Sequence, residues 1–214
     1  MSDKLSIGLV GGAGSLPDLL AEKHDIWVGA DAGAKALASA GIRMKLAVGD
    51  FDSVSEEDIV LIRQYADEVI MFPPEKDETD LELAIRYAEG YGAHVVSVYG
   101  VTGGRLDHEL INIQMLYRLL DTFEQAVIID RQNDIRMNRP GTYHIEQDHT
   151  YRYVSFLSFS EQVTGLTLTG FKYPLTDASI HWGETLSISN ELVAQTGTYS
   201  FASGIVIMIK SKDV

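Results

Sequence analysis

The sequence predicts an α/β domain with a Rossmann-like, mostly parallel sheet, followed by an all-β domain of antiparallel strands. Through about residue 130, short apolar runs ending in Gly or Asp alternate with segments of helical periodicity, as in βα units. Beyond that point come runs rich in Thr, Tyr, Val, Ile and Phe, interrupted by Gly and Pro. We therefore expect an α/β domain over residues 1–130 and a β-sandwich, or a small barrel, over residues 131–214.

The first domain has a strand and helix pattern that can be read segment by segment. The expected strands are LSIGLVGG, DIWVGADAGA, KLAVGDFDS, EVIMFPP, HVVSVYGVTGG and QAVIID. Helical spacing places Leu81, Ala84, Ile85 and Ala88 on one face, and likewise Leu106, Leu110, Ile113, Tyr117 and Leu120. A further helix begins within SEEDIVLIRQY. In such a sheet the ligand crevice lies outside the carboxyl ends of the strands.

The second domain begins after a polar segment, residues 131–141, that ends in a Pro-Gly turn signal. The β-rich runs that follow are TYHIEQ, TYRYVSFLSFS, VTGLTLTGFKYPL, ETLSISNELV and GTYSFASGIVIMIKS. They alternate in places and carry turn residues between them, which favours antiparallel pairing.

Composition excludes several classes of protein. The chain has 214 residues, of which 45% are hydrophobic and 22% charged, as in globular proteins. It has no apolar run long enough to cross a bilayer, no secretory leader pattern and no cysteine, so we expect a cytoplasmic location and no membrane partner. The net charge of -14 argues against a nucleic-acid partner. A polyphosphate ligand would need a metal ion and well-placed donors to overcome this charge.

Glycines follow the first expected strand. Gly11 and Gly12 in VGGAGS would let the backbone approach a phosphate. The full dinucleotide fingerprint is missing, however, and a glycine turn alone is more often structural.

Two acidic motifs follow later strands. Asp50 and Asp52 flank a phenylalanine in GDFDS, and on an extended backbone they would point the same way, as Mg²⁺ ligands do. The alternative is a turn in which Ser53 or Ser55 caps the next helix. In KDETDLE, Asp80 lies in the first turn of a helix that a Thr79 and Glu82 capping box would begin, so a capping role is the alternative there.

The stretch VTGGRLDHEL combines a phosphate-type motif with a carboxylate. Thr102, Gly103, Gly104 and Arg105 follow a strand, and the planar guanidinium of arginine suits phosphate oxygens. Asp107 would repel a phosphate unless a metal ion bridges the two, and its alternative role is to stabilise the helix N-terminus. His108 is a possible base, but an orienting or surface histidine is favoured. Such clusters at the ends of several strands describe a magnesium–nucleotide site for phosphoryl or pyrophosphoryl transfer, without a Walker A motif.

These motifs resemble the thiamine pyrophosphokinase family, over nearly the whole chain and in the family's order. The matching segments are ADAGA (30–34), GDFDS (49–53), KDETDLELAI (76–85), TGGRLDH (102–108), FKYPL (171–175) and SISNEL (187–192). One departure is Ala32, where the family pattern has glycine.

The resemblance implies Mg²⁺-dependent transfer of a pyrophosphoryl group from ATP to the hydroxyl of thiamine, with the catalytic roles on Asp52, Asp80, Asp107 and Arg105. It implies metal ligation by Asp50, Asp52, Asp80 and Asp107. It implies ATP binding by Gly11, Gly12, Asp31, Thr102, Gly103, Gly104 and Arg105. Thiamine would contact Asp107, Tyr173, Ser189 and Asn190, in a homodimer whose sites lie at the interface. The alternatives are a related metal-dependent kinase or pyrophosphokinase of another small alcohol, and a non-catalytic thiamine or nucleotide sensor.

Overall fold

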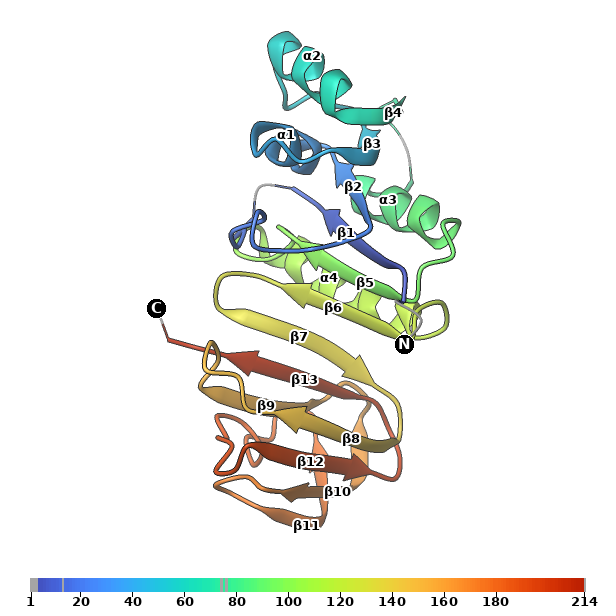
Figure 1. Ribbon diagram of the computed structural model, residues 1–214. Coiled ribbons are helices and arrows are strands. Elements are labelled where there is room, and N and C mark those ends of the chain that lie inside the picture. The colour runs from blue at the N-terminus through green and yellow to red at the C-terminus, as the bar shows by residue number, and fades with distance from the viewer. Residues whose placement is uncertain (1–3, 13, 74, 76, 214) are drawn as a thin grey trace. The chain divides into compact units, whose positions relative to one another are not determined.

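The computed structural model describes residues 4–12, 14–73, 75 and 77–213 (Figure 1). The chain divides into two compact units, Met1–Arg131 and Gln132–Val214. Their architectures are those that the sequence predicts: parallel strands with helices in the first, antiparallel strands in the second. No helix in the described ranges is long and apolar enough to cross a membrane.

The first unit, over the residues that the structure describes, is built on six parallel strands in the order β4-β3-β2-β1-β5-β6. The strands are β1 (Ser6–Val10), β2 (Ile26–Ala30), β3 (Met44–Gly49), β4 (Ala66–Met71), β5 (Val95–Tyr99) and β6 (Gln125–Ile129). The chain builds outward from β1 to β4, then returns to place β5 on the other side of β1. The strand order therefore reverses at β1, and this topological switch point is where open α/β sheets bind ligands.

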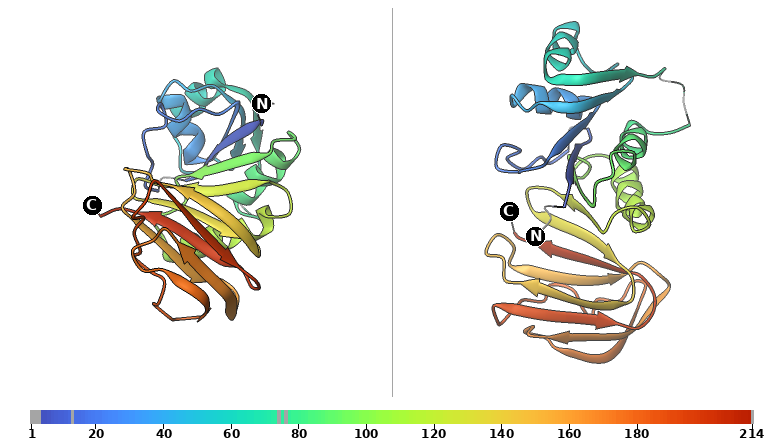
Figure 2. Two further views of the ribbon diagram at one scale, coloured as in Figure 1. Left: turned by 60° about the horizontal axis from the view of Figure 1, so that its bottom comes forward. Right: turned by 45° about the vertical axis from the view of Figure 1, so that its right-hand side comes forward.

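Four helices within the described part of this unit cover the two faces of the sheet. They are α1 (Ala32–Ser39), α2 (Glu56–Tyr65), α3 (Asp80–Glu89) and α4 (Leu106–Leu119). Helices α1 and α2 lie on one face and α3 and α4 on the other (Figures 1 and 2). This division follows from right-handed crossovers, because the chain moves in opposite directions across the sheet before and after β4.

The helix starts that the sequence predicts are largely confirmed. Ser55, one of the two serines considered, caps α2 in a reciprocal capping box with Asp58. Thr79 caps α3 by accepting a hydrogen bond from the backbone N–H of Glu82 at 3.2 Å. Only this half of the predicted capping box is present, because the Glu82 carboxylate forms an ion pair with Arg118 at 2.8 Å, a long-range contact that local spacing does not reveal.

Helix α4 presents a different face to the sheet than its apolar stripe suggests. Leu106 and Leu110 are exposed by 68% and 52%, whereas Leu116 and Leu119 are buried. On the inner face, in the second turn of the helix, the Asn112 amide donates to the Val101 carbonyl at 2.9 Å. An apolar stripe of α4 therefore lies open on this chain.

The second unit is a β-sandwich. One sheet has the order β7-β13-β9 and the other β11-β10-β12-β8, with antiparallel pairing in both. The strands are β7 (Asn133–Asn138), β8 (Gly141–Glu146), β9 (Tyr153–Ser158), β10 (Gln162–Thr169), β11 (Leu175–His181), β12 (Thr196–Phe201) and β13 (Val206–Ser211). Buried side chains from both sheets, among them Phe156, Leu166, Tyr199 and Met208, form one core.

Two segments of this unit differ from the expected pattern. The polar run before Pro140 contains strand β7, because Ile135 and Met137 alternate with polar residues and turn toward the interior. The ETLSISNELV segment forms turns with isolated bridges at Asn190 and Leu192 instead of a strand. Two buried polar side chains anchor this segment: the Ser187 hydroxyl donates to the Phe156 carbonyl in β9, and the Asn190 amide donates to the Tyr173 carbonyl.

Candidate active site

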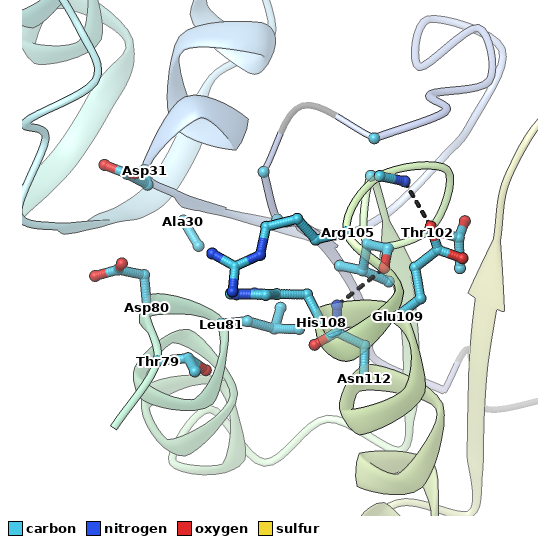
Figure 3. Close-up of a pocket in the computed structure, with 16 residues that line it drawn as sticks. Ala30, Asp31, Thr79, Asp80, Leu81, Thr102, Arg105, His108, Glu109 and Asn112 are labelled. Carbon is cyan, nitrogen blue, oxygen red and sulfur yellow. Dashed lines mark hydrogen bonds between the residues drawn. The ribbon is translucent and has the colours of Figure 1, made fainter. Parts of the chain in front are cut away.

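A pocket of about 420 Å³ lies in the first unit at the carboxyl ends of β1, β2 and β5 (Figure 3). This is the switch point of the sheet, where the first two strands of the chain and β5 meet. The lining residues are Gly11, Gly12, Gly14, Ala30, Asp31, Thr79, Asp80, Leu81, Gly100, Val101, Thr102, Gly104, Arg105, His108, Glu109 and Asn112. Most of the residues predicted for the phosphate end of the site are among them.

Two glycine-containing loops form one wall of the pocket and are joined by backbone hydrogen bonds. Gly11 N–H donates to the Tyr99 carbonyl at 2.8 Å, and Ser15 N–H donates to the Thr102 carbonyl at 2.9 Å. Arg131 adds a third tie through its Nε, which donates to the Leu16 carbonyl at 2.8 Å. The loops are thereby held close together with little side-chain volume between them and a ligand, which suits phosphate binding.

Three carboxylates gather beside this wall. Asp31, Asp50 and Asp52 each offer an oxygen, and the three oxygens lie within 4.8 Å of one another. Phe51 between the two predicted aspartates is buried, as its role in the core requires, but its backbone is left-handed (φ 57°) and not extended. Its N–H donates to Asp31 Oδ1 at 3.0 Å, so the GDFDS loop is fastened to the end of β2.

The electrostatics of this cluster favour a bound cation. Burial raises the pKa of the Asp31 carboxyl above its ordinary value, and the charges of Asp80 and Asp50 raise it further. Clustered carboxylates repel unless a cation joins them, and carboxylate oxygens are the ligands that Mg²⁺ prefers. The donor set therefore fits Mg²⁺. Asp31, placed by the sequence among the ATP-binding residues, belongs to this cluster in space.

Asp107, also predicted as a metal ligand, has a different partner in this structure. Its carboxylate forms a two-point contact with the guanidinium of Arg105, at 3.1 Å from Nε and 2.6 Å from Nη2. Hydrogen bonding to Arg105 lowers the pKa of Asp107 to about 2. The two residues expected to serve a phosphate and a metal thus neutralise each other at the start of α4.

Two further polar contacts at this site involve residues that the sequence did not single out. The Thr102 hydroxyl donates to the carboxylate of Asp130 at 2.7 Å, and both residues are buried. The proton of that hydroxyl is therefore directed away from any phosphate. Gly104 N–H donates to Glu109 Oε1 at 2.6 Å. The sequence alone could have pointed to Asp130, because this residue ends the apolar run QAVIID just as Asp31 ends the run IWVGAD.

Of the predicted thiamine residues, Asp107 belongs to the first unit, whereas Tyr173, Ser189 and Asn190 lie together in the second. The Asn190 amide forms two hydrogen bonds with the backbone of Tyr173, accepting at 3.0 Å and donating at 2.8 Å. Asn190 is buried, while Tyr173 is 57% exposed with Lys172 Nζ 5.6 Å from its ring centroid. Ser189 is exposed and has a left-handed backbone (φ 53°). Asn190 thus holds an open aromatic ring in place, and the ring and Ser189 are the groups available to a ligand.

A parallel sheet with glycine loops, an arginine and clustered carboxylates at its switch point defines an α/β protein suited to metal-complexed phosphates. Residues 17–129 match the model of the thiamin pyrophosphokinase catalytic domain, and residues 142–206 match that of its vitamin B1 binding domain. The chain belongs to the thiamine pyrophosphokinase family.

Individual relatives agree with this membership. The thiamine pyrophosphokinase of Bacillus subtilis is 47% identical over 200 residues, covering 92% of this chain and 94% of the relative. A crystal structure of the Bacillus subtilis protein superposes with a TM-score of 0.92 at 45% identity, over 98% of this chain and 100% of that one. A thiamin pyrophosphokinase family protein from Enterococcus faecalis gives 0.89 at 32% identity, with 98% and 100% covered.

Proposed function

We propose that this enzyme transfers a pyrophosphoryl group from ATP to the hydroxyl of thiamine, giving thiamine diphosphate and AMP. The observation that carries the proposal is the meeting of glycine loops, Arg105 and the carboxylates of Asp31, Asp50 and Asp52 at one switch point, in a member of this family. Backbone donors at Gly12, Gly103 and Gly104, with Arg105, would take the phosphates of ATP, and Gly11 would let the backbone come close to them.

We propose Mg²⁺ as the metal, held by Asp31, Asp50 and Asp52. A bound Mg²⁺ would neutralise charge on the phosphate oxygens during transfer. Asp80 adds a further negative charge beside these three carboxylates, and this charge contributes to the raised pKa of Asp31. Asp107 can join the metal ligands only by leaving Arg105, and a phosphate that pairs with Arg105 would release it.

The proposed reaction is an in-line pyrophosphoryl transfer. The hydroxyl oxygen of thiamine attacks the β-phosphorus in line, the bond from that phosphorus to the oxygen of the α-phosphate breaks, and AMP leaves. The hydroxyl proton passes to a carboxylate, for which Asp107 and Asp80 are the candidates. While Asp107 is paired with Arg105 its low pKa makes it a weak base, which favours Asp80.

The direct test is to incubate the protein with ATP, Mg²⁺ and thiamine and to identify the nucleotide released. We expect AMP in equal amount to thiamine diphosphate, and none when thiamine is omitted. Release of ADP would instead mean single phosphoryl transfer. Thiamine binding by calorimetry without any turnover would favour the sensor, and turnover only with another alcohol, such as a pterin, would favour the related kinase.

Replacing Tyr173 with Ala is expected to weaken thiamine binding by about tenfold, because an exposed aromatic face stabilises a thiazolium cation. ATP affinity should stay unchanged. Calorimetric titration with each ligand measures both effects, and Tyr173→Phe is the matched control, since it keeps the ring and should bind thiamine almost as well as the native chain. A loss of ATP affinity in Tyr173→Ala would mean that the thiamine site is elsewhere.

We propose that the enzyme is a homodimer with its sites at the interface, as its family resemblance implies. The open apolar stripe of α4, with Leu106, Leu110 and Tyr117 exposed by 68%, 52% and 46%, supports self-association. Sedimentation equilibrium at several concentrations tests this, and a mass of one chain throughout would contradict it.

A further inference from the structure

The Gly104 amide, one of the donors expected to serve a phosphate, is occupied by a carboxylate of the same chain. Glu109 Oε1 accepts its hydrogen bond at 2.6 Å, and both residues line the pocket (Figure 3). A carboxylate oxygen and a phosphate oxygen compete for the same N–H. Any anion that binds this amide must first displace Glu109.

The position of Glu109 follows from the orientation of α4. Glu109 lies three residues before Asn112 and seven before Leu116, so the three share the inner face of the helix. Asn112 is bonded to the Val101 carbonyl and Leu116 is buried, which fixes this face toward the sheet. The first turn of a helix also stabilises a carboxylate. Glu109 is therefore aimed into the pocket by the packing of its helix.

The neighbouring donor is occupied in the same way. Arg105 is paired with Asp107, so both the amide and the guanidinium of the 104–105 segment face carboxylates of the first turn of α4. Both carboxylates also accept a backbone hydrogen bond, Asp107 from His108 N–H at 3.0 Å and Glu109 from Gly104 N–H. They differ in charge balance, because Asp107 is paired with Arg105 whereas Glu109 forms no ion pair among the described residues, so the Glu109 charge is not neutralised in the pocket.

We infer that Glu109 is a specificity-determining residue that makes the pocket discriminate against nucleotide without metal. The inference rests on the proposed nucleotide function. Uncomplexed ATP carries roughly twice the negative charge of its magnesium complex, so the Glu109 carboxylate repels it more strongly. The metal complex offsets this repulsion and gains the additional contacts of the aspartate cluster.

The test is calorimetric titration of Glu109→Gln with a non-hydrolysable ATP analogue, once in excess Mg²⁺ and once in EDTA. We expect about a two- to fivefold gain in affinity for the analogue in EDTA and a smaller gain in Mg²⁺, so that the preference for the complex falls. Glu57→Gln on the exposed first turn of α2 is the matched control. It removes the same net charge outside the pocket and should change neither value.

Glu109→Ala, which also removes the hydrogen-bond acceptor, should reproduce the loss of preference and covers the case in which the glutamine variant folds poorly. If the native chain binds the analogue in Mg²⁺ but Glu109→Gln and Glu109→Ala behave like Glu57→Gln, the role of Glu109 is overturned while the nucleotide site stands. If both Glu109 variants lose affinity in both conditions, Glu109 supports binding and the inference is wrong. If the native chain binds no analogue at all, the proposed function falls together with the inference.

Discussion

Replacing Asp31 with Asn is expected to reduce turnover by about 100-fold or more and, in the absence of metal, to make the protein more stable. Turnover falls because the cluster with Asp50 and Asp52 loses one of its anionic ligands. Asparagine is nearly isosteric, and its carbonyl oxygen can still accept the hydrogen bond from Phe51 N–H. The two effects have opposite signs because the same charge that would hold a cation repels its neighbours without one.

The sign of the stability effect follows from the pKa of Asp31. Burial, Asp80 and Asp50 raise this pKa in the folded state above its value in the unfolded chain. The folded state therefore binds the proton more tightly, and stability is lost as pH rises from the unfolded pKa through the raised folded pKa. At neutral pH the full penalty is present, and Asp31→Asn removes it.

Thermal unfolding in EDTA at neutral pH measures this penalty. The melting temperature of Asp31→Asn should exceed that of the native chain by roughly 1–3 °C. The expected difference is small because solvent screens the charge of a partly exposed carboxylate. The difference should vanish near pH 3, where the native carboxyl is protonated. Asp177→Asn is a matched control, because Asp177 also has a left-handed backbone (φ 50°) but lies in the second unit. A native-like or lower melting temperature for Asp31→Asn would show that Asp31 bears no such repulsion.

Replacing Gly33 with Ala is expected to destabilise the first unit by about 3 kcal/mol or more. Gly33 is buried in α1, and an added Cβ would overlap the carbonyl oxygens of Val10 and Gly11, far inside van der Waals contact. These atoms belong to backbone at the end of β1 and cannot move aside as a flexible side chain could. The substitution should therefore also displace the glycine loop that lines the pocket and weaken ATP binding.

The melting temperature of the first unit should fall by roughly 6–12 °C in Gly33→Ala, as followed by circular dichroism at 222 nm. Ala32→Gly is the control, because it alters the neighbouring position in the opposite direction and restores the glycine of the family pattern. It should cost no more than about 1 kcal/mol, through backbone entropy. Equal melting temperatures for Gly33→Ala and the native chain would contradict the close approach of α1 to β1.

Local chemistry explains the features of this protein that could be predicted without a structure. The alternation of period-two and helical segments predicts the α/β unit, and the Thr- and Tyr-rich runs predict the sandwich. Ser55 and Thr79 are predicted as helix caps because capping needs only a hydroxyl a few residues before an amide. Local pattern does not predict strand β7 or the bridged segment around Asn190, because the pairing partners of both lie far along the chain.

The carboxylate cluster and the orientation of α4 depend on contacts between residues far apart in the sequence, which residue spacing does not predict. Asp31 joins Asp50 and Asp52 because β2 and β3 are paired neighbours whose carboxyl ends meet, and strand order is a property of the sheet. Helix α4 turns the face with Asn112 and the buried Leu116 toward the sheet, and its apolar stripe stays exposed.

The two-part architecture, the family and the acidic and glycine motifs can be read from the amino-acid sequence, because they depend on periodicity and on residue types a few positions apart. The folded chain adds which charged and polar groups meet: Asp31 with the GDFDS aspartates, Asp107 with Arg105, and Glu109 with the Gly104 amide. Electrostatic and hydrogen-bond partners must lie within a few ångströms of each other, and those distances arise from strand order and helix rotation.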